Sequence, residues 1–139
     1  QPHPQGAPPV SRLDPTPQHA RARCHCGAVE IEAWLPEGLA SARRCDCSIC
    51  RRRGPGAVTA TTDSIRVLSG RDHLRLYTWN THTARHWFCT TCGSYVYHQR
   101  RSDPAECGVN IGCLDGIRPR DFADIPWTDG INHSSDRDA

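Results

Sequence analysis

Apolar and polar residues alternate along several short stretches of the chain, which is the period of β-strands. The clearest stretch runs from Val29 to Leu35, where every second residue is aliphatic, and it ends at Pro36. Further alternating or β-branched runs cover residues 57–61, 65–68, 74–79, 85–89, 94–99 and 107–112. Helix is expected only as short turns after Cys50 and over residues 120–124. Short strands separated by Gly and Pro turns predict an antiparallel, all-β fold.

The two ends of the chain differ in composition from the strand-forming part. Residues 1–21 are rich in proline, with Gln, Ala and His between, and such a segment buries too little apolar surface to offset its ordering entropy. We therefore expect a disordered tail over residues 1–21, a single zinc-binding domain over 22–130 and a polar tail over 131–139.

Charge and hydropathy limit the classes of partner. The formal net charge of the 139 residues is +2, which gives no argument for nucleic acid or an anionic membrane. No apolar run approaches the length of a membrane span or a secretory leader. These patterns predict a soluble protein of the cytoplasm that binds no membrane.

Nine cysteines are a heavy loading for a chain of 139 residues. Their odd number and close spacing, as C-x-C, C-x-C-x-x-C and C-x-x-C, make a poor disulfide framework, although a secreted disulfide scaffold remains an alternative. Close cysteine pairs instead present neighbouring thiolates to one ion, as structural zinc sites do. The spacing predicts two zinc ions.

One predicted zinc site is closed by four thiolates. Cys24 and Cys26 supply one pair of ligands and the predicted hairpin tip supplies the other pair, Cys89 and Cys92. Each pair is followed by a glycine, which permits the sharp turn that such a site needs. Four thiolates complete a tetrahedron, so this site is expected to stabilise the fold; four buried cysteines without metal are the alternative.

The second predicted site has three ligands, Cys45, Cys47 and Cys50. Three protein ligands leave one position open, as catalytic zinc sites do. Three thiolates weaken the metal as a Lewis acid but still let it ionise a coordinated thiol, which indicates a thiol substrate. Two alternatives are that Cys113 or Cys107 closes the site, and that the triplet is a redox cluster without metal.

Basic residues and histidines surround these cysteines. Arginines flank the triplet on both sides: Arg43, Arg44, Arg51, Arg52 and Arg53. They form either a solvated charge run or a binding site for the carboxylates of a substrate. His82 and His86 precede Cys89 and are either packing residues or a proton shuttle.

The flanks of the cysteine clusters resemble those of the glutathione-dependent formaldehyde-activating enzyme family. The similar segments are Cys24-His25-Cys26-Gly27-Ala28-Val29, Cys45-Asp46-Cys47-Ser48-Ile49-Cys50 and Phe88-Cys89-Thr90-Thr91-Cys92-Gly93. The stretches Tyr77-Thr78-Trp79-Asn80-Thr81-His82 and Cys113-Leu114-Asp115 look like the centromere protein V branch of that family.

The resemblance implies more than the spacing does. It implies a β-tent fold of coiled antiparallel sheets, a structural zinc at Cys24, Cys26, Cys89 and Cys92, and a catalytic zinc at Cys45, Cys47 and Cys50. It also implies a carbon–sulfur lyase that condenses formaldehyde with glutathione, for which Arg51, Arg52 and Arg53 are the candidate binding residues. The competing hypothesis is a non-catalytic zinc module that binds a protein or a nucleic acid.

Overall fold

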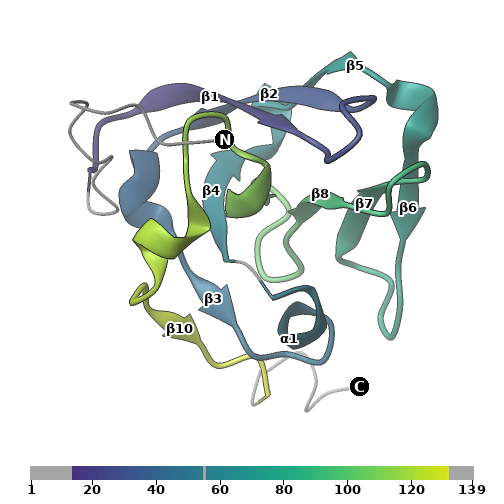
Figure 1. The fold of residues 1–139 in the computed structure, drawn as a ribbon. Coiled ribbons are helices and arrows are strands. Elements are labelled where there is room, and N and C mark those ends of the chain that lie inside the picture. The colour runs from purple at the N-terminus through teal and green to yellow at the C-terminus, as the bar shows by residue number, and fades with distance from the viewer. Residues whose placement is uncertain (1–13, 55, 132–139) are drawn as a thin grey trace.

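The computed structural model describes residues 14–54 and 56–131 and is mostly β-sheet (Figure 1). The strands form three sheets. The largest is antiparallel, with strand order β4 (Ala57–Thr61), β9 (Glu106–Asn110), β8 (Tyr95–Gln99), β7 (Arg85–Cys89) and β6 (Leu74–Tyr77). The second joins β1 (Gln18–Arg23), β2 (Glu30–Leu35) and β5 (Arg66–Ser69), and the third pairs β10 (Trp127–Thr128) in parallel with β3 (Arg44–Cys45).

Helical segments in the described part of the chain are short. The one α-helix, α1, covers Cys50–Arg53, and the 3-10 turns cover Gly38–Ser41, Thr62–Ser64, Arg71–His73, Ile111–Cys113 and Pro119–Phe122. The helical turns expected after Cys50 and near residue 120 are therefore present. No helix among the described residues is long and apolar enough to cross a membrane.

The strand runs expected between residues 29 and 110 are all present, with ends shifted by one or two positions. The clearest shift is at β9, which ends at Asn110 although the sequence pattern continued to residue 112. There the Asn110 side chain accepts a hydrogen bond from the Gly112 N–H at 2.9 Å, which starts a 3-10 turn. The expectation of a mainly β fold is confirmed.

The first strand begins inside the segment expected to be a disordered tail. β1 starts at Gln18 and pairs with β2, so that Gln18 lies opposite Leu35. Its inward-facing residues are Ala20 and Ala22, whose small side chains give a weak apolar signal between polar neighbours. The tail prediction is therefore wrong for residues 18–21, while residues 1–13 lie outside the described part, as do 132–139 of the predicted polar tail.

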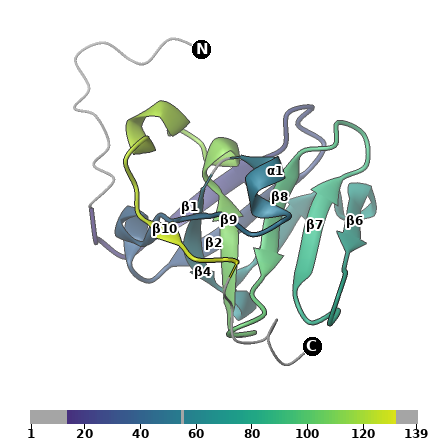
Figure 2. The same cartoon turned by 90° about the horizontal axis from the view of Figure 1, so that it is seen from below.

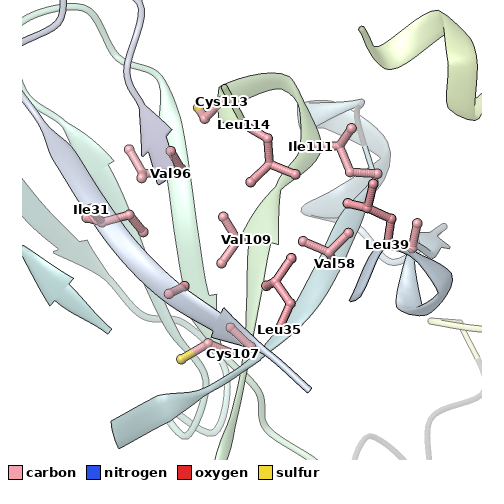
Figure 3. Close-up of a cluster of buried hydrophobic side chains, with 14 of the residues drawn as sticks. Ile31, Leu35, Leu39, Val58, Val96, Cys107, Val109, Ile111, Cys113 and Leu114 are labelled. Atoms are coloured by element: carbon pink, nitrogen blue, oxygen red, sulfur yellow. The ribbon is translucent and has the colours of Figure 1, made fainter. Parts of the chain in front are cut away.

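The core lies between the three-stranded sheet and the large sheet (Figure 3). Ile31 and Leu35 of β2 pack there with Val58 of β4, Val96 of β8 and Val109 of β9, all fully buried. Each aliphatic side chain of this kind contributes about 1.5–3 kcal/mol of hydrophobic stabilisation. This core holds the two sheets together, so that Cys24, which follows β1, and Cys89, at the end of β7, are brought into one region.

Two short elements lie beside the large sheet and complete the site. The helix α1 lies next to β8 (Figure 2), and the guanidinium of Arg53 lies 3.7 Å from the centre of the Tyr95 ring. β3 leads into the Cys45 triplet and is held by β10 from the far end of the chain. Segments that are distant in sequence therefore meet around the Cys45 triplet.

Candidate active site

The structure brings together the four cysteines of the expected closed site. The sulfur atoms of Cys24, Cys26, Cys89 and Cys92 all lie within 4.8 Å of one another. Cys26 Sγ lies 3.6 Å from Cys24 Sγ and 3.8 Å from Cys89 Sγ. A zinc ion with Zn–S bonds of about 2.3 Å in a tetrahedron places its sulfurs about 3.8 Å apart, so the four positions fit zinc.

The backbone around this cluster supports thiolate ligands. Gly27 and Gly93 have φ of 81° and 78°, the left-handed values that each knuckle turn requires. The N–H of Val29 donates to Cys24 Sγ at 3.3 Å. A hydrogen bond with the Ser94 hydroxyl, 3.3 Å away, lowers the pKa of Cys92 to about 5. The cluster therefore joins the β1–β2 hairpin to the β7–β8 hairpin.

The triplet is also assembled. The sulfurs of Cys45, Cys47 and Cys50 lie within 4.8 Å of one another, at the end of β3 and the start of α1. Hydrogen bonds from the thiols of Cys45 and Cys50 hold the pKa of Cys47 well below its usual range. Among residues 14–54 and 56–131, no fourth His, Cys, Asp or Glu ligand atom joins this group. The donor set fits a metal ion with one position left for a further ligand.

Neither of the remaining cysteines closes the triplet. Cys113 lies close enough to Cys24 and Cys92 for their charges to raise its pKa further, after burial, to about 11. Its thiol donates to the Tyr95 carbonyl at 3.4 Å. Cys107 Sγ instead lies 3.4 Å from the Thr62 hydroxyl. The alternative in which one of these two completes the triplet site is therefore wrong.

The triplet opens onto a cavity of about 670 Å³ that is rich in arginine. The arginines in its wall come from three segments of the chain: Arg43, Arg44, Arg51, Arg53, Arg100 and Arg101. The acidic residues in the same wall are Asp46 and Asp129. Of the three arginines singled out from the sequence, Arg52 is the exception, because it lines a neighbouring cavity of about 510 Å³ and donates to the Ser48 carbonyl at 2.6 Å. This charge distribution favours an anionic ligand.

A set of buried and half-buried aromatic and polar side chains connects the triplet to the large sheet. His86 on β7 lies opposite His98 on β8, and their rings stack with centroids 5.2 Å apart. The Tyr95 hydroxyl and His98 Nδ1 are 2.5 Å apart, and the Arg53 guanidinium covers the Tyr95 ring. Arg53 Nη2 in turn lies 3.8 Å from Cys50 Sγ. A continuous series of contacts therefore runs from His86 to the triplet.

The two histidines singled out from the sequence have different surroundings. His82 is exposed, and its Nδ1 lies 2.8 Å from the Thr78 hydroxyl. His86 is 6% exposed and lines both cavities. Desolvation, together with the charge of Arg53, lowers the pKa of His86 to about 4. At neutral pH His86 is therefore an uncharged imidazole inside the site.

Sequence reasoning missed His98 and Tyr95, and Gly108 explains how the His98 ring fits. Gly108 on β9 lies opposite His98, and a Cβ atom there would lie 2.5 Å from His98 Cε1. We expect Gly108→Ala to displace this ring and to lower the free energy of unfolding by about 1–3 kcal/mol, as overpacking does. Urea denaturation measures the loss.

A double-mutant cycle tests the stated cause of that loss. In a His98→Ala background the ring is absent, so Gly108→Ala should cost clearly less than it does in the wild type. An equal cost in both backgrounds would mean that the His98 ring does not set the requirement for glycine.

Comparison with known proteins places this arrangement in a family. The profile described as glutathione-dependent formaldehyde-activating enzyme matches residues 19–126. A Halomonas elongata protein named "Putative glutathione-dependent formaldehyde-activating enzyme" is 32% identical over 82 residues, which are 53% of this chain and 52% of that protein. The chain thus spans about half the length of this curated relative.

A solved structure is similar over a larger part of the chain. The crystal structure of a Rhodobacter sphaeroides protein is 57% identical, with a TM-score of 0.75, and the match covers 78% of this chain and 99% of that one. The family profile covers most of the described residues, both cysteine clusters included. The chain belongs to the glutathione-dependent formaldehyde-activating enzyme family.

Proposed function

We propose that this protein is a zinc-dependent carbon–sulfur lyase that condenses glutathione, or a related thiol, with formaldehyde or a similar small electrophile. The observation that carries the proposal is the position of the Cys45, Cys47 and Cys50 sulfurs, which form a three-thiol group in the wall of an arginine-rich cavity. Membership of the family and the printed name of the Halomonas elongata relative agree with it.

The cysteines are proposed to hold two zinc ions. Cys24, Cys26, Cys89 and Cys92 would bind the structural ion, and Cys45, Cys47 and Cys50 the catalytic one. When bound at the triplet, zinc supplies the Lewis acidity that lowers the pKa of a thiol at the remaining position. The guanidinium of Arg53, 3.8 Å from Cys50 Sγ, offsets the negative charge of three thiolates.

The arginines are proposed to hold the thiol substrate in place. Arg51 and Arg53 on α1 line the cavity together with Arg100 and Arg101 beyond β8, so that carboxylates can be bound in the same cavity as the triplet. Charge-assisted hydrogen bonds of this kind fix orientation as well as affinity. Orientation matters here because holding a nucleophile beside its target removes most of the entropic part of the barrier.

The proposal also covers the type of fold, the bounds of the domain and the cellular compartment of the protein. We propose that the described sheets form the coiled β-tent of the family, and that the domain extends from β1 to about residue 130. The cysteines must stay reduced to bind metal, so we propose a reducing compartment such as the cytoplasm.

Exchange spectroscopy by NMR tests the proposed reaction. The zinc-loaded protein is expected to speed the exchange between formaldehyde and its glutathione adduct above the protein-free rate, and Cys47→Ser is expected to abolish the increase by removing a triplet thiol. The matched control is Cys107→Ser, which changes a cysteine outside both clusters and should keep the increase. An unchanged exchange rate with two zinc ions bound would contradict the proposal.

A second candidate function is a non-catalytic zinc module that binds a protein or nucleic acid. The observation in its favour is that Arg43, Arg44, Arg100 and Arg101 gather on one cavity wall although they lie far apart in sequence. Titration with duplex DNA over a salt series separates the two functions. We expect weak binding that falls steeply with salt, as non-specific phosphate contacts do; tight binding at physiological salt would favour the module.

A further inference from the structure

We infer that His86 is a catalytic residue of this site, which takes the proton from the substrate thiol and returns it to the carbonyl oxygen of the electrophile. The inference rests on the proposed function and deepens it, because nothing in the condensation itself says which group moves the proton. Three features of the structure support it: the position of His86, its unsatisfied ring nitrogen and the support that its ring receives.

The position of His86 is the first feature. The arginine-rich cavity and its neighbour share a few wall residues, and His86 is one of them, with Ile49, Arg53 and Tyr95. Ile49 and Arg53 flank Cys50, and the charge of Cys47 acts on His86. The imidazole therefore lies in the wall that the two cavities share, and the arginine-rich cavity is the one in which a bound thiol and its electrophile would react.

The second feature is a buried atom without a partner. His86 Nδ1 is buried and makes no hydrogen bond in the described part of the chain. Leaving such a group unsatisfied costs about 1–3 kcal/mol, so most buried ring nitrogens are paired. The other two unpaired buried nitrogens are guanidinium Nε atoms of Arg44 and Arg53, whose terminal nitrogens do have partners. Among the described residues, His86 has the one imidazole with an unpaired buried nitrogen, and the accessible edge of its ring is the part that a ligand in the two cavities would meet.

The third feature is that packing fixes the orientation of the His86 ring. The ring of His98 stacks against it with an interplanar angle of 20°, and His98 is itself fixed by the Tyr95 hydroxyl. The bond between the Tyr95 hydroxyl and His98 Nδ1 fixes the His98 ring, which therefore positions the ring of His86.

The proposed step balances without any other reagent. The S–H bond of the thiol breaks, and its proton moves to the ring nitrogen of His86 that faces the cavity. The sulfur then forms the C–S bond while the π electrons of the carbonyl move to oxygen, and His86 returns the proton to that oxygen. No atom is oxidised or reduced, and the imidazole ends as it began.

The variant His86→Gln tests the inference, with His82→Asn as the matched control. His82 is exposed with φ of 57°, a backbone conformation that asparagine tolerates. In the exchange assay we expect kcat of His86→Gln to fall about 100-fold, the lower end of the range for general acid–base catalysis, with an unchanged KM for glutathione. Imidazole added to His86→Ala should restore part of the rate, which a purely structural role would not allow.

The outcomes separate failure of this inference from failure of the proposed function. A wild-type protein that accelerates nothing overturns both. An active wild type with a fully active His86→Gln overturns the inference alone, as does loss of the second zinc from that variant, because His86 would then be a ligand. If the variants do not fold, ¹⁵N NMR of the wild type decides: glutathione should shift the ring nitrogen resonances of His86, and unchanged resonances overturn the inference.

Discussion

Replacing Cys89 with alanine is expected to destabilise the protein strongly. Cys89 is fully buried at the end of β7, and its sulfur lies 3.8 Å from that of Cys26 on the other hairpin. Structural zinc sites contribute about 10–16 kcal/mol of binding energy to folding, whereas a domain of this size is stable by only about 5–15 kcal/mol. We therefore expect a loss of about 5 kcal/mol or more, because three ligands hold the metal far less tightly.

The control for that loss is another fully buried cysteine. Cys107 lies on β9, outside both clusters, and contacts the Thr62 hydroxyl. Cys107→Ala should cost about 1 kcal/mol, a typical value for a core substitution. Urea denaturation and zinc analysis measure both variants. Equal losses for the two, with two zinc ions still bound, would show that the cluster is not a metal site.

The strands could be predicted from the sequence wherever aliphatic residues alternate with polar ones. Residues 30–35 show this directly, since Ile31, Ala33 and Leu35 are buried and their neighbours are not. β1 was missed because its inward side chains are alanines. β3 and β10 were missed because each has two residues, and their parallel pairing joins segments too far apart for any local signal.

The sequence predicted which cysteines form the candidate site but not the other side chains around them. The spacing of the cysteines grouped them correctly, since each short motif contributes neighbouring sulfurs. The stack of His86 on His98 was not predictable, because a β-bulge between Trp87 and Phe88 shifts the pairing of β7 with β8. Counting outward from the C-x-x-C turn without the bulge places Tyr97 opposite His86, and a slip of one residue turns every side chain to the other face.

The last described residues form a wall of the triplet site that the sequence did not reveal. The N–H of Gly130 donates to the Asp46 carboxylate at 2.8 Å, just beyond the pairing of β10 with β3. A Cβ atom on Gly130 would lie 2.5 Å from Cys47 Cβ and 2.6 Å from Cys45 Sγ. The φ of Gly130 is not left-handed, so glycine is required there by close approach alone.

Gly130→Ala is therefore expected to weaken the triplet site while leaving the fold intact. The added methyl group must displace either the C-terminal segment or the triplet. Disturbing the surroundings of metal ligands typically lowers metal affinity by about 10- to 100-fold. Competition with a zinc chelator measures the loss of zinc affinity. The loss should affect the ion at the triplet and not the ion at the four-cysteine site. The matched control is Gly112→Ala, where the added carbon meets only the Asn110 side chain at 3.3 Å. Equal zinc affinity in the two variants would mean that Gly130 does not pack against the triplet in solution.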